Sequence, residues 1–288
     1  MISGKTRVLG VIGHPVEHSS SPAMHNAALQ ALGLDWVYVA FAVRPAELRA
    51  ALAGMRALQI RGLNVTVPHK VAVMECLDEL SPEAREIGAV NTIHNRDGRL
   101  IGHNTDAFGA MESLRQEGGL EQFPPQAALL GAGGAARAVL YGLLQRPEVE
   151  RITLLNRTPE KGEKLATELD PGGKRVRVGK LDPQSKDQVR DAGLLINATS
   201  VGMHPRQGES PLADPSCLRP GMVVLDLVYN PLQTLLLRQA QEAGARPVDG
   251  LGMLARQGAR AFEIWTGMEP PVEVMRKAAL ERLGKPVI

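Results

Sequence analysis

The 288-residue sequence contains few aromatic residues and almost no excess charge. Phe, Trp and Tyr together make up 3% of it, and 33 Lys and Arg residues against 31 Asp and Glu residues leave a formal net charge of +2. Proteins that bind nucleic acids usually carry clustered basic residues, often beside aromatic side chains on which bases stack. The basic residues are scattered here, so we expect no nucleic-acid partner.

Cysteines, metal-binding patterns and long apolar runs are also scarce. Cys76 and Cys217 lack CxxC spacing, which favours reduced thiols. Pro15 lies between His14 and His18 and argues against a helical face shared by these two histidines, so we expect no metal site. The apolar run near the start is too short for a signal peptide or a membrane span. These features favour a cytoplasmic protein that acts on a small molecule without a membrane partner.

Strand-like apolar runs alternate with helical patterns along most of the chain. This alternation predicts an α/β fold with a mostly parallel sheet covered on both faces. In the first part we expect strands at 8–13, 36–43 and 60–67, helices at 21–32, 45–58, 71–80 and 105–116, a short helix from 81, and a hairpin around the Asp-Gly pair at 97–98.

The chain is long enough for two domains, and the Gly- and Pro-containing segment 117–126 is the expected boundary. Residues 1–116 would form one domain, completed by C-terminal helices from about 253–288. Residues 117–252 would form a doubly wound domain of the Rossmann type. Its expected strands lie before the glycines at 131–134 and at 151–156, 194–200, 222–229 and 245–248, and the amphipathic helix 271–284 should pack on the first domain.

A glycine turn opens the second domain with the pattern G-x-G-x-x-A. Gly131 allows a tight turn, Gly133 lets the backbone approach a pyrophosphate, and Ala136 lets the helix lie close to the strand. A compact strand-to-helix connection would use similar residues, but another strand follows one helix later. The context therefore favours a dinucleotide site at the start of the helix.

The residues after the second strand of this domain indicate which dinucleotide. NAD sites usually carry an acidic residue there for the ribose 2′-hydroxyl, whereas this chain has Arg157, with Lys161 one turn later. A guanidinium can hold a 2′-phosphate through paired, charge-assisted hydrogen bonds. The two residues could also be ordinary surface charges, but their position favours NADP.

Polar residues gather where strands of the first domain are expected to end. They occur in SSSP (19–22), in NVTVPHK (64–70), at Asn91 and at Asp106. Each has a structural alternative: Ser21 could cap one helix and Thr105 or Asp106 another, while asparagines could satisfy loop backbone. In NVTV we expect Thr66 to face a ligand and the valines to face the core. Their joint occurrence at one sheet edge favours a binding site.

Together these motifs resemble the signature set of the shikimate dehydrogenase family. The matching motifs are HSSSP, NVTVPHK, GAVNT, NTDAFG, GAGGAARA, NRT, NATSVGM and DGLGMLARQGA, in that family's order from about residue 8 to 265. The resemblance implies the reversible NADPH-linked reduction of 3-dehydroshikimate to shikimate in chorismate and aromatic amino-acid biosynthesis. It also implies a two-domain enzyme with its active site in the cleft between a substrate domain and an NADP domain.

The resemblance assigns roles to particular residues. It implies that Lys70 and Asp106 form the catalytic pair, and it leaves open which of them gives the proton. The other substrate contacts that it implies are Ser19, Ser21, Asn64, Thr66, Asn91, Tyr229 and Gln257. The cofactor contacts are Gly131, Ala132, Gly133, Gly134, Ala135, Asn156, Arg157, Thr158, Lys161, Thr199, Leu227, Gly250 and Met253. A homodimer is possible.

Three other functions stay in view. A dehydrogenase that also accepts quinate would share the motifs, although the Ser-x-Ser pair favours shikimate. A folate dehydrogenase would have a similar domain order but is disfavoured by the joint presence of Asn91, Asp106 and Gln257. A catalytically silent NADP-binding sensor would be expected to lack the Lys70–Asp106 pair.

Overall fold

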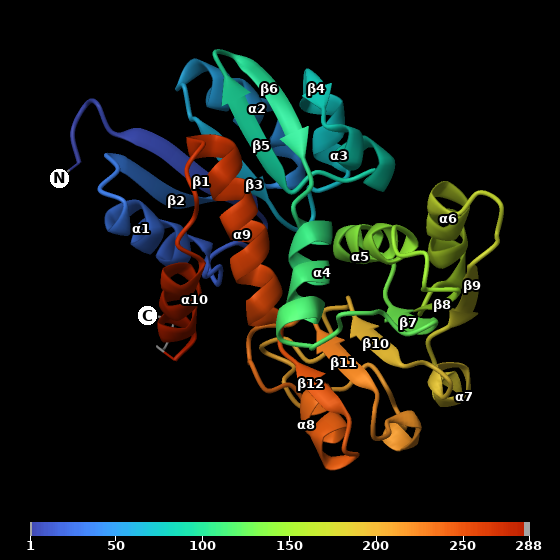
Figure 1. Ribbon diagram of the computed structural model, residues 1–288. Coiled ribbons are helices and arrows are strands. Elements are labelled where there is room, and N and C mark those ends of the chain that lie inside the picture. Colours follow the sequence, from blue (N-terminus) through green and yellow to red (C-terminus); the bar gives the residue numbers. More distant parts are fainter. Residues whose placement is uncertain (1, 285–288) are drawn as a thin grey trace. The chain divides into compact units, whose positions relative to one another are not determined.

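The computed structural model describes residues 2–284 and divides the chain into two compact units (Figure 1). One unit is formed by the chain up to Gly109 together with the chain from Ala255 onward, and the other by Ala110–Leu254. Both changes of unit fall inside helices, namely α4 (Asp106–Gln116) and α9 (Gly250–Thr266). The segment 117–126 follows the end of α4, so the loop marks where the helix stops rather than where the unit changes.

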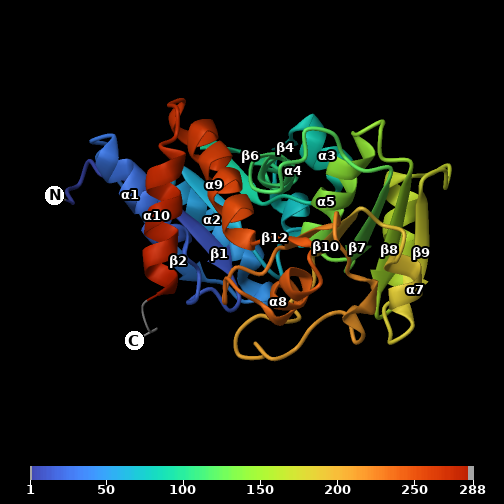
Figure 2. The ribbon, with the colours of Figure 1, turned by 60° about the horizontal axis from the view of Figure 1, so that its bottom comes forward.

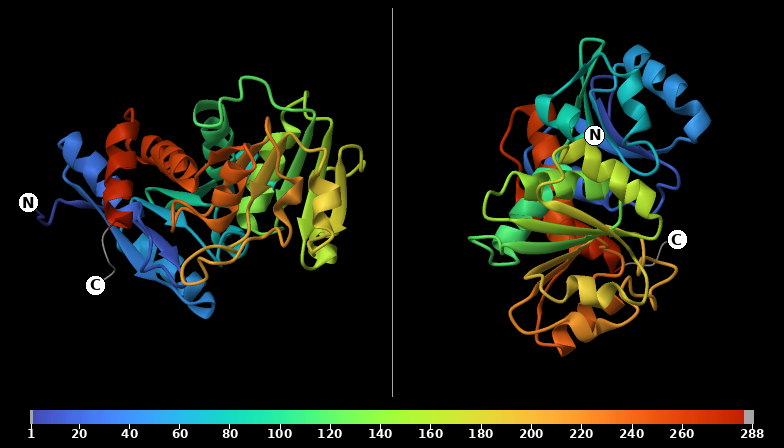
Figure 3. Two further views of the ribbon diagram at one scale, coloured as in Figure 1. Left: turned by 90° about the horizontal axis from the view of Figure 1, so that it is seen from below. Right: turned by 90° about the vertical axis from the view of Figure 1, so that its right-hand side faces the viewer.

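The first unit is built on a six-stranded mixed sheet of order β2-β1-β3-β5-β6-β4. β1 pairs in parallel with β2 and with β3, and β5 pairs antiparallel with β3 on one side and with β6 on the other. Helix α10 (Val272–Leu283) packs against α1 in this unit (Figures 1 and 3). The remaining elements are β1 (Arg7–Gly13), α1 (Ser21–Ala31), β2 (Trp36–Ala42), η1 (Pro45–Glu47), α2 (Leu48–Ala57), β3 (Gly62–Val65), η2 (Ala72–Cys76), β4 (Glu79–Leu80), α3 (Pro82–Ile87), β5 (Thr92–Arg96) and β6 (Arg99–His103).

The second unit is a parallel six-stranded sheet of order β12-β11-β10-β7-β8-β9. Figure 2 shows β7, β8 and β9 side by side. The order is that of the Rossmann fold, with the direction of winding reversing between β7 and β10. Its elements are β7 (Gln126–Leu130), α5 (Gly134–Leu144), β8 (Arg151–Asn156), α6 (Pro159–Leu169), β9 (Val176–Lys180), α7 (Ser185–Val189), β10 (Leu194–Asn197), η3 (Pro215–Cys217), β11 (Val223–Asp226), α8 (Leu235–Glu242) and β12 (Arg246–Val248).

The central strand β7 explains why this sheet is covered on both faces. Ala127 and Leu129 belong to one buried apolar cluster, while the alternate residues Ala128 and Leu130 belong to another. Side chains alternate across a strand, so a strand that is apolar throughout buries both of its faces. The α/β fold with two mostly parallel sheets, predicted from the sequence, is confirmed.

Three local predictions need correction. The helix expected at 71–80 is a 3-10 segment, η2, followed by the two-residue strand β4, which pairs with β6. Strand β3 ends at Val65, so Val67 does not face the core and is 67% exposed. Strand β9 was not expected, because VRVGK carries two basic residues and a glycine and lies at the edge of its sheet.

Across residues 2–284, we find no helix with the combined length and apolar character that a membrane crossing requires. Cys76 and Cys217 are both free.

Candidate active site and cofactor site

Strand direction in the first unit brings four polar segments to one edge of the sheet. Asn64, near the end of β3, stands opposite Thr92, the first residue of β5, because these strands are antiparallel. Thr92 in turn stands opposite His103, the last residue of β6. The expected location of Asn91 at a strand's carboxyl end is therefore wrong. Asn91 precedes its strand, and it reaches the same edge because β5 runs in the opposite direction.

Lys70 and Asp106 form a close and mostly buried ion pair at this edge. The distance from Lys70 Nζ to Asp106 Oδ2 is 2.5 Å, and the side chains are 15% and 5% exposed. The Lys70 carbonyl accepts a hydrogen bond from the Val90 N–H at 2.8 Å, which ties this residue to the segment before β5. Lys70 and Asp106 are therefore the candidate residues for proton transfer to or from a substrate.

Helix α4 places Asp106 through a capping residue that the sequence did not indicate. Asn104 Oδ1 accepts hydrogen bonds from the backbone N–H groups of Asp106 at 3.0 Å and Ala107 at 3.4 Å. Asn104 Nδ2 donates to the Ala89 carbonyl at 3.0 Å. The alternative that Thr105 or Asp106 caps this helix is therefore wrong, and both side chains are available for other contacts.

Asn91 is the centre of the buried polar cluster. Its Nδ2 group donates to Asp106 Oδ1 at 2.8 Å, to Thr105 Oγ1 at 2.9 Å and to Gln257 Oε1 at 3.3 Å. Its Oδ1 accepts from the Thr105 N–H at 2.8 Å and from Thr92 Oγ1 at 3.1 Å. Gln257 comes from α9, which Trp265 holds against the sheet by donating from Nε1 to the Ile93 carbonyl at 2.9 Å. Asn91 and Gln257, which are 166 positions apart in the sequence, thus contact each other through their side-chain amides.

Asn64 joins the cluster from the neighbouring strand. Its Nδ2 group donates to the Asn91 carbonyl at 3.2 Å and to Thr92 Oγ1 at 3.1 Å, while its Oδ1 accepts from the Tyr38 hydroxyl at 2.7 Å. A carboxamide has two N–H donors, so both donors of Asn64 are occupied. One acceptor position on Oδ1 remains for a ligand.

Of the hydroxyl residues, Ser19 and Thr66 lie in the loops that follow β1 and β3, and Ser21 is the first residue of α1. These loops are joined by a hydrogen bond from the His14 N–H to the Val67 carbonyl, 3.0 Å long. Ser19 and Thr66 are partly exposed, and the Ser19 hydroxyl accepts from the Ser21 N–H at 3.2 Å. Ser21 does not cap α1 as suggested, because Ser20 occupies the N-cap position and makes no side-chain cap bond.

His69, in the middle of the NVTVPHK motif, has a structural contact. It is 1% exposed, and its Nε2 atom lies 2.7 Å from the Val43 carbonyl oxygen. The contact anchors the turn that delivers Lys70 and occupies the Nε2 atom of His69.

In the second unit, the glycine turn lies where the winding of the sheet reverses. Gly131 follows β7 with a φ of 107°, and a Cβ atom there would lie 3.0 Å from the Ala198 carbonyl oxygen beyond β10. Gly133 is the N-cap of α5, and a Cβ atom there would meet nothing within 4 Å. The first turn of α5 directs unpaired backbone N–H groups into this space, which suits an anion.

The segment after β8 carries two exposed cations. Arg157 and Lys161 form no ion pair with any residue in the range 2–284. Asn156 Nδ2 donates to the Thr158 carbonyl at 2.8 Å and so shapes the turn before α6. A turn with two unpaired cations and no carboxylate suits a phosphate group.

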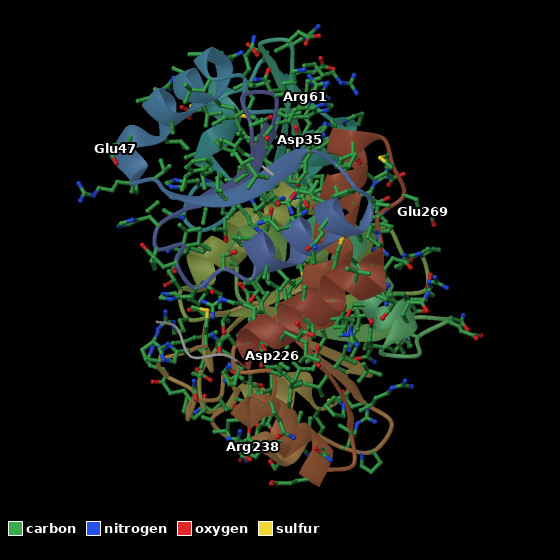
Figure 4. The ribbon with its side chains drawn as sticks, turned by 90° about the vertical axis from the view of Figure 1, so that its left-hand side faces the viewer. Asp35, Glu47, Arg61, Asp226, Arg238 and Glu269 are labelled. Atoms are coloured by element: carbon green, nitrogen blue, oxygen red, sulfur yellow. The ribbon has the colours of Figure 1, made fainter. Side chains whose placement is uncertain are left out.

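A buried carboxyl group supports the loops after β10 and β11. Asp226, labelled in Figure 4, accepts hydrogen bonds from Asn197 Nδ2 at 2.8 Å and from Thr234 Oγ1 at 2.7 Å. Burial raises the pKa of Asp226 to about 6, against the opposing effect of these donors. Asn197 Oδ1 also accepts from Thr199 Oγ1 at 2.7 Å. Asp226 therefore holds Thr199 and, through the chain, Leu227 in place.

The remaining predicted residues of this unit lie near the end of β11 and the start of α9. Gly250 is the first residue of α9, and Met253, 7% exposed, packs in the apolar cluster beneath β7. Tyr229 is partly exposed, and burial raises the pKa of its phenol.

A hollow of about 660 Å³ elsewhere in the first unit does not coincide with the polar cluster. It lies between α2 and residues 75–78, and the ion pairs Arg49–Glu75 and Arg56–Asp78 cross it. Its charges are already paired, so we do not assign chemistry to it. In the described part of the chain, no group of three or more His, Cys, Asp or Glu side chains could hold a metal ion.

Family models match three stretches of the chain. Residues 11–93 match the shikimate dehydrogenase substrate binding domain, residues 119–211 match shikimate / quinate 5-dehydrogenase, and residues 250–280 match the shikimate 5'-dehydrogenase C-terminal domain. The NADP(+)-dependent shikimate dehydrogenase of Methanopyrus kandleri is 50% identical over 284 residues, which cover 98% of either chain. The chain belongs to the shikimate dehydrogenase family.

Solved structures of shikimate dehydrogenases have the same fold. One, in complex with NADP+, is 45% identical with a TM-score of 0.90 and covers 99% of this chain and 98% of its own. The enzyme from Thermus thermophilus, in complex with NADP(H) and shikimate, is 41% identical with a TM-score of 0.85, covering 96% of this chain and 100% of its own.

The structure brings most of the predicted substrate residues of this family into one connected cluster. Lys70, Asp106, Asn91, Asn64 and Gln257 are linked by hydrogen bonds. Ser19 and Thr66 lie in the loops after β1 and β3 and Ser21 is the first residue of α1, and in the described part of the chain their side chains form no direct bond to that cluster. Sequence reasoning missed the bridging residues, which are Tyr38, Thr92, Asn104 and Thr105. Only their proximity in sequence to Asn91 and Asp106 could have indicated the last three.

Proposed function

We propose that this chain catalyses the reversible NADPH-dependent reduction of 3-dehydroshikimate to shikimate, a step of chorismate and aromatic amino-acid biosynthesis. The observation that carries the proposal is the Lys70–Asp106 pair, 2.5 Å apart within the family's substrate motifs. The NADP(+)-dependent relatives and the cofactor motifs of the second unit support the same activity.

The residues after β7 and β8 fit NADP. Gly131, with its left-handed backbone, and Gly133, with open space beside it, let the segment up to Ala135 receive a pyrophosphate. Arg157 and Lys161, together with Asn156 and Thr158, would hold the 2′-phosphate. Thr199, Leu227, Gly250 and Met253 complete the proposed contacts.

When bound, NADPH supplies the hydride, and the protein must stabilise and protonate the oxygen that receives it. Lys70 Nζ donates one hydrogen bond to Asp106, which leaves two ammonium hydrogens for a substrate oxygen. Its charge stabilises the developing alkoxide, and the pair supplies the proton. Asp106 holds the ammonium group in position.

The proposed substrate contacts suit a ring that bears a carboxylate and several hydroxyl groups. Ser19, Ser21 and Tyr229 offer hydroxyls, and hydrogen bonds from such groups to a charged carboxylate contribute about 1.5–3 kcal/mol each. Thr66, Asn91 and Gln257 would contact ring hydroxyls. Asn64 would act through the free acceptor position on Oδ1, because both of its N–H donors are used inside the protein.

Two further features belong to the proposal. A biosynthetic step that uses NADPH is consistent with a cytoplasmic location. A homodimer is compatible with the family, and light scattering of the purified protein would measure its mass against the 30.9 kDa of one chain.

Deuterium transfer tests the reaction itself. The enzyme is supplied with 3-dehydroshikimate and NADPH that carries deuterium at the transferring position. We expect shikimate with one deuterium on the carbon that bore the ketone. Product without deuterium, or no product, would refute the proposed reaction.

A further inference from the structure

We propose that Tyr38 is a positioning residue of the reaction, which acts on Asp106 through a chain of four hydrogen bonds that all point in one direction. The proposal rests on the function proposed above. Tyr38 lies on β2, two strands away from the strand that carries Asn64, and belongs to none of the motifs that indicated the active site.

The chain of hydrogen bonds passes from donor to acceptor at each step. The Tyr38 hydroxyl donates to Asn64 Oδ1 at 2.7 Å, and Asn64 Nδ2 donates to Thr92 Oγ1 at 3.1 Å. Thr92 Oγ1 donates to Asn91 Oδ1 at 3.1 Å, and Asn91 Nδ2 donates to Asp106 Oδ1 at 2.8 Å. No member is more than 6% exposed. The chain ends on the carboxyl group that holds Lys70.

Because these residues are buried, the donor-to-acceptor direction of the chain has an energetic consequence. A buried donor or acceptor that loses its partner costs about 1–3 kcal/mol, and successive hydrogen bonds polarise and strengthen one another. With the Tyr38 hydroxyl in place, Asn64 Oδ1 has a donor and Asn64 Nδ2 faces Thr92. Thr92 accepts from Asn64, so its own hydrogen is directed to Asn91. The Asn91 amide oxygen accepts from Thr92 and from the Thr105 N–H, so its nitrogen faces Asp106, and the chain from Tyr38 adds to the alignment that the Thr105 N–H also supports.

Tyr38 is held both at its backbone and across its ring. The Asn26 side chain, from α1, accepts from the Tyr38 N–H at 2.9 Å and donates to the Tyr38 carbonyl at 2.8 Å. The His25 ring stacks on the Tyr38 ring, with centroids 4.3 Å apart and planes 7° from parallel. A residue held at its backbone and across its ring is a suitable fixed point for the chain.

At the Asp106 end of the chain, these hydrogen bonds determine which carboxylate oxygen faces Lys70. Asn91 occupies Asp106 Oδ1, so Oδ2 is the oxygen that faces Lys70. Loss of the Tyr38 hydroxyl leaves Asn64 Oδ1 without this donor. The orientation in which Asp106 Oδ1 faces Asn91 and Oδ2 faces Lys70 is then less strongly favoured. Turnover should depend on this alignment more than the binding of NADP does, because the cofactor motifs lie in other segments.

The test is a double-mutant cycle with two nearly isosteric changes, Tyr38→Phe and Thr92→Val. Tyr38→Phe keeps the stacked ring, and each change removes one hydroxyl from the chain. We expect each to lower kcat for shikimate about fivefold to tenfold, the equivalent of one hydrogen bond, with KM for NADP+ unchanged. Because both act through the same chain, the double variant should lose little more than either single variant.

Different results would distinguish a failure of the proposed function from a failure of this inference. A wild-type enzyme without shikimate-dependent reduction of NADP+ would refute the proposed function, not this inference alone. An active wild type with unchanged kcat in Tyr38→Phe, or losses that multiply in the double variant, would overturn the role of Tyr38.

Tyr141→Phe, on α5, is the matched control and should behave as wild type. Thermal unfolding checks each variant, and if Tyr38→Phe does not fold, unchanged kcat in Thr92→Val overturns the chain.

Discussion

Asn104 shows how one capping residue determines what its neighbours can do. A helix start needs side-chain acceptors for its first N–H groups, and Asn104 Oδ1 supplies one for α4. The Asp106 carboxylate is then free for Lys70 and Asn91. Three consecutive polar residues, Asn104, Thr105 and Asp106, thus have different roles because only the side chain of Asn104 turns back to the backbone of the helix.

The ammonium group of Lys70 is the feature on which turnover should depend most. Lys70→Met keeps much of the volume of the stem and removes the charge and the proton. We expect kcat for shikimate to fall by roughly 10²–10⁴-fold, the usual loss for an acid–base group. The affinity for NADP+ should hardly change, since its proposed site lies in other segments. Steady-state kinetics and cofactor titration would measure both.

Lys5→Met is the control for that substitution. Lys5 is exposed in the same unit, so the same chemical change should leave kcat at the wild-type value. Near-normal turnover in a folded Lys70→Met variant would remove Lys70 from the mechanism.

Arg157 should determine the choice of cofactor. Arg157→Asp replaces an exposed guanidinium by a carboxylate that repels a 2′-phosphate. The efficiency with NADP+ relative to NAD+ should fall by roughly tenfold to a hundredfold, the range for losing a hydrogen bond to a charged group. Arg151, at the other end of β8, is also exposed, and Arg151→Asp should leave the ratio unchanged. Equal efficiencies of the wild type with NAD+ and NADP+ would contradict the role of Arg157.

At the scale of elements, the two glycines of the β7–α5 turn make separable contributions. Gly131→Ala places a side chain at a φ of 107° and 3.0 Å from the Ala198 carbonyl oxygen. It should therefore lower the free energy of unfolding by about 1–3 kcal/mol. Gly133→Ala meets nothing within 4 Å and has a φ of −89°, so it should fold normally. It should weaken NADP+ binding instead, because its methyl group occupies the space for the pyrophosphate.

Circular dichroism follows the stability of both variants, and calorimetric titration follows their cofactor affinity. A destabilised Gly133→Ala variant, or one that binds NADP+ as tightly as wild type, would show that the turn does not receive the cofactor in this way.

Some elements could be predicted from the sequence and others could not, for physical reasons. The hairpin after β5 was predicted from Asp97 and Gly98, which do adopt positive φ values of 53° and 93°. Local sequence determines such a turn. The segment 71–80 has an apolar pattern that suits a helix, but pairing of β4 with β6 takes its end into the sheet. Tertiary pairing overrides local preference there.

The site shows the same division between local and distant information. Lys70 and Asp106 could be named from motifs, because each lies in a distinctive short stretch. Tyr38 could not, because its partner Asn64 is 26 residues away and the contact depends on the order of strands in the sheet. Residues that act through other residues leave little trace in a single sequence.

At the scale of the whole molecule, His25 links the stability of the first unit to pH. Burial lowers the pKa of His25 from 6.5 to about 3, against a smaller opposing effect of Asn64. At a pH between these two pKa values, His25 is protonated in the unfolded chain and neutral in the folded chain. The folded state is therefore at its full stability above pH 6.5, and its free energy of unfolding decreases as the pH falls below that pKa. Between about pH 7 and pH 5 the loss should be about 2 kcal/mol from this residue.

His25→Phe keeps a stacked ring and removes the titrating group, so it should reduce this acid-dependent loss by about 2 kcal/mol. His94, whose pKa burial lowers to about 4, maintains part of the pH dependence. Both tryptophans, Trp36 and Trp265, lie in the first unit, so their fluorescence during urea unfolding reports on it alone. His18→Asn, at an exposed position, should retain the full loss. An unchanged pH dependence in His25→Phe would contradict the assignment.

The most direct test of the whole account is the initial rate of cofactor reduction by the purified wild-type enzyme with each pairing of shikimate or quinate with NADP+ or NAD+. We predict the highest kcat/KM for shikimate with NADP+, a lower value when NAD+ replaces NADP+, and a lower value when quinate replaces shikimate. A protein that binds NADP+ but reduces it with neither substrate would be the silent sensor, and the account of Lys70 and Asp106 as a catalytic pair would be wrong.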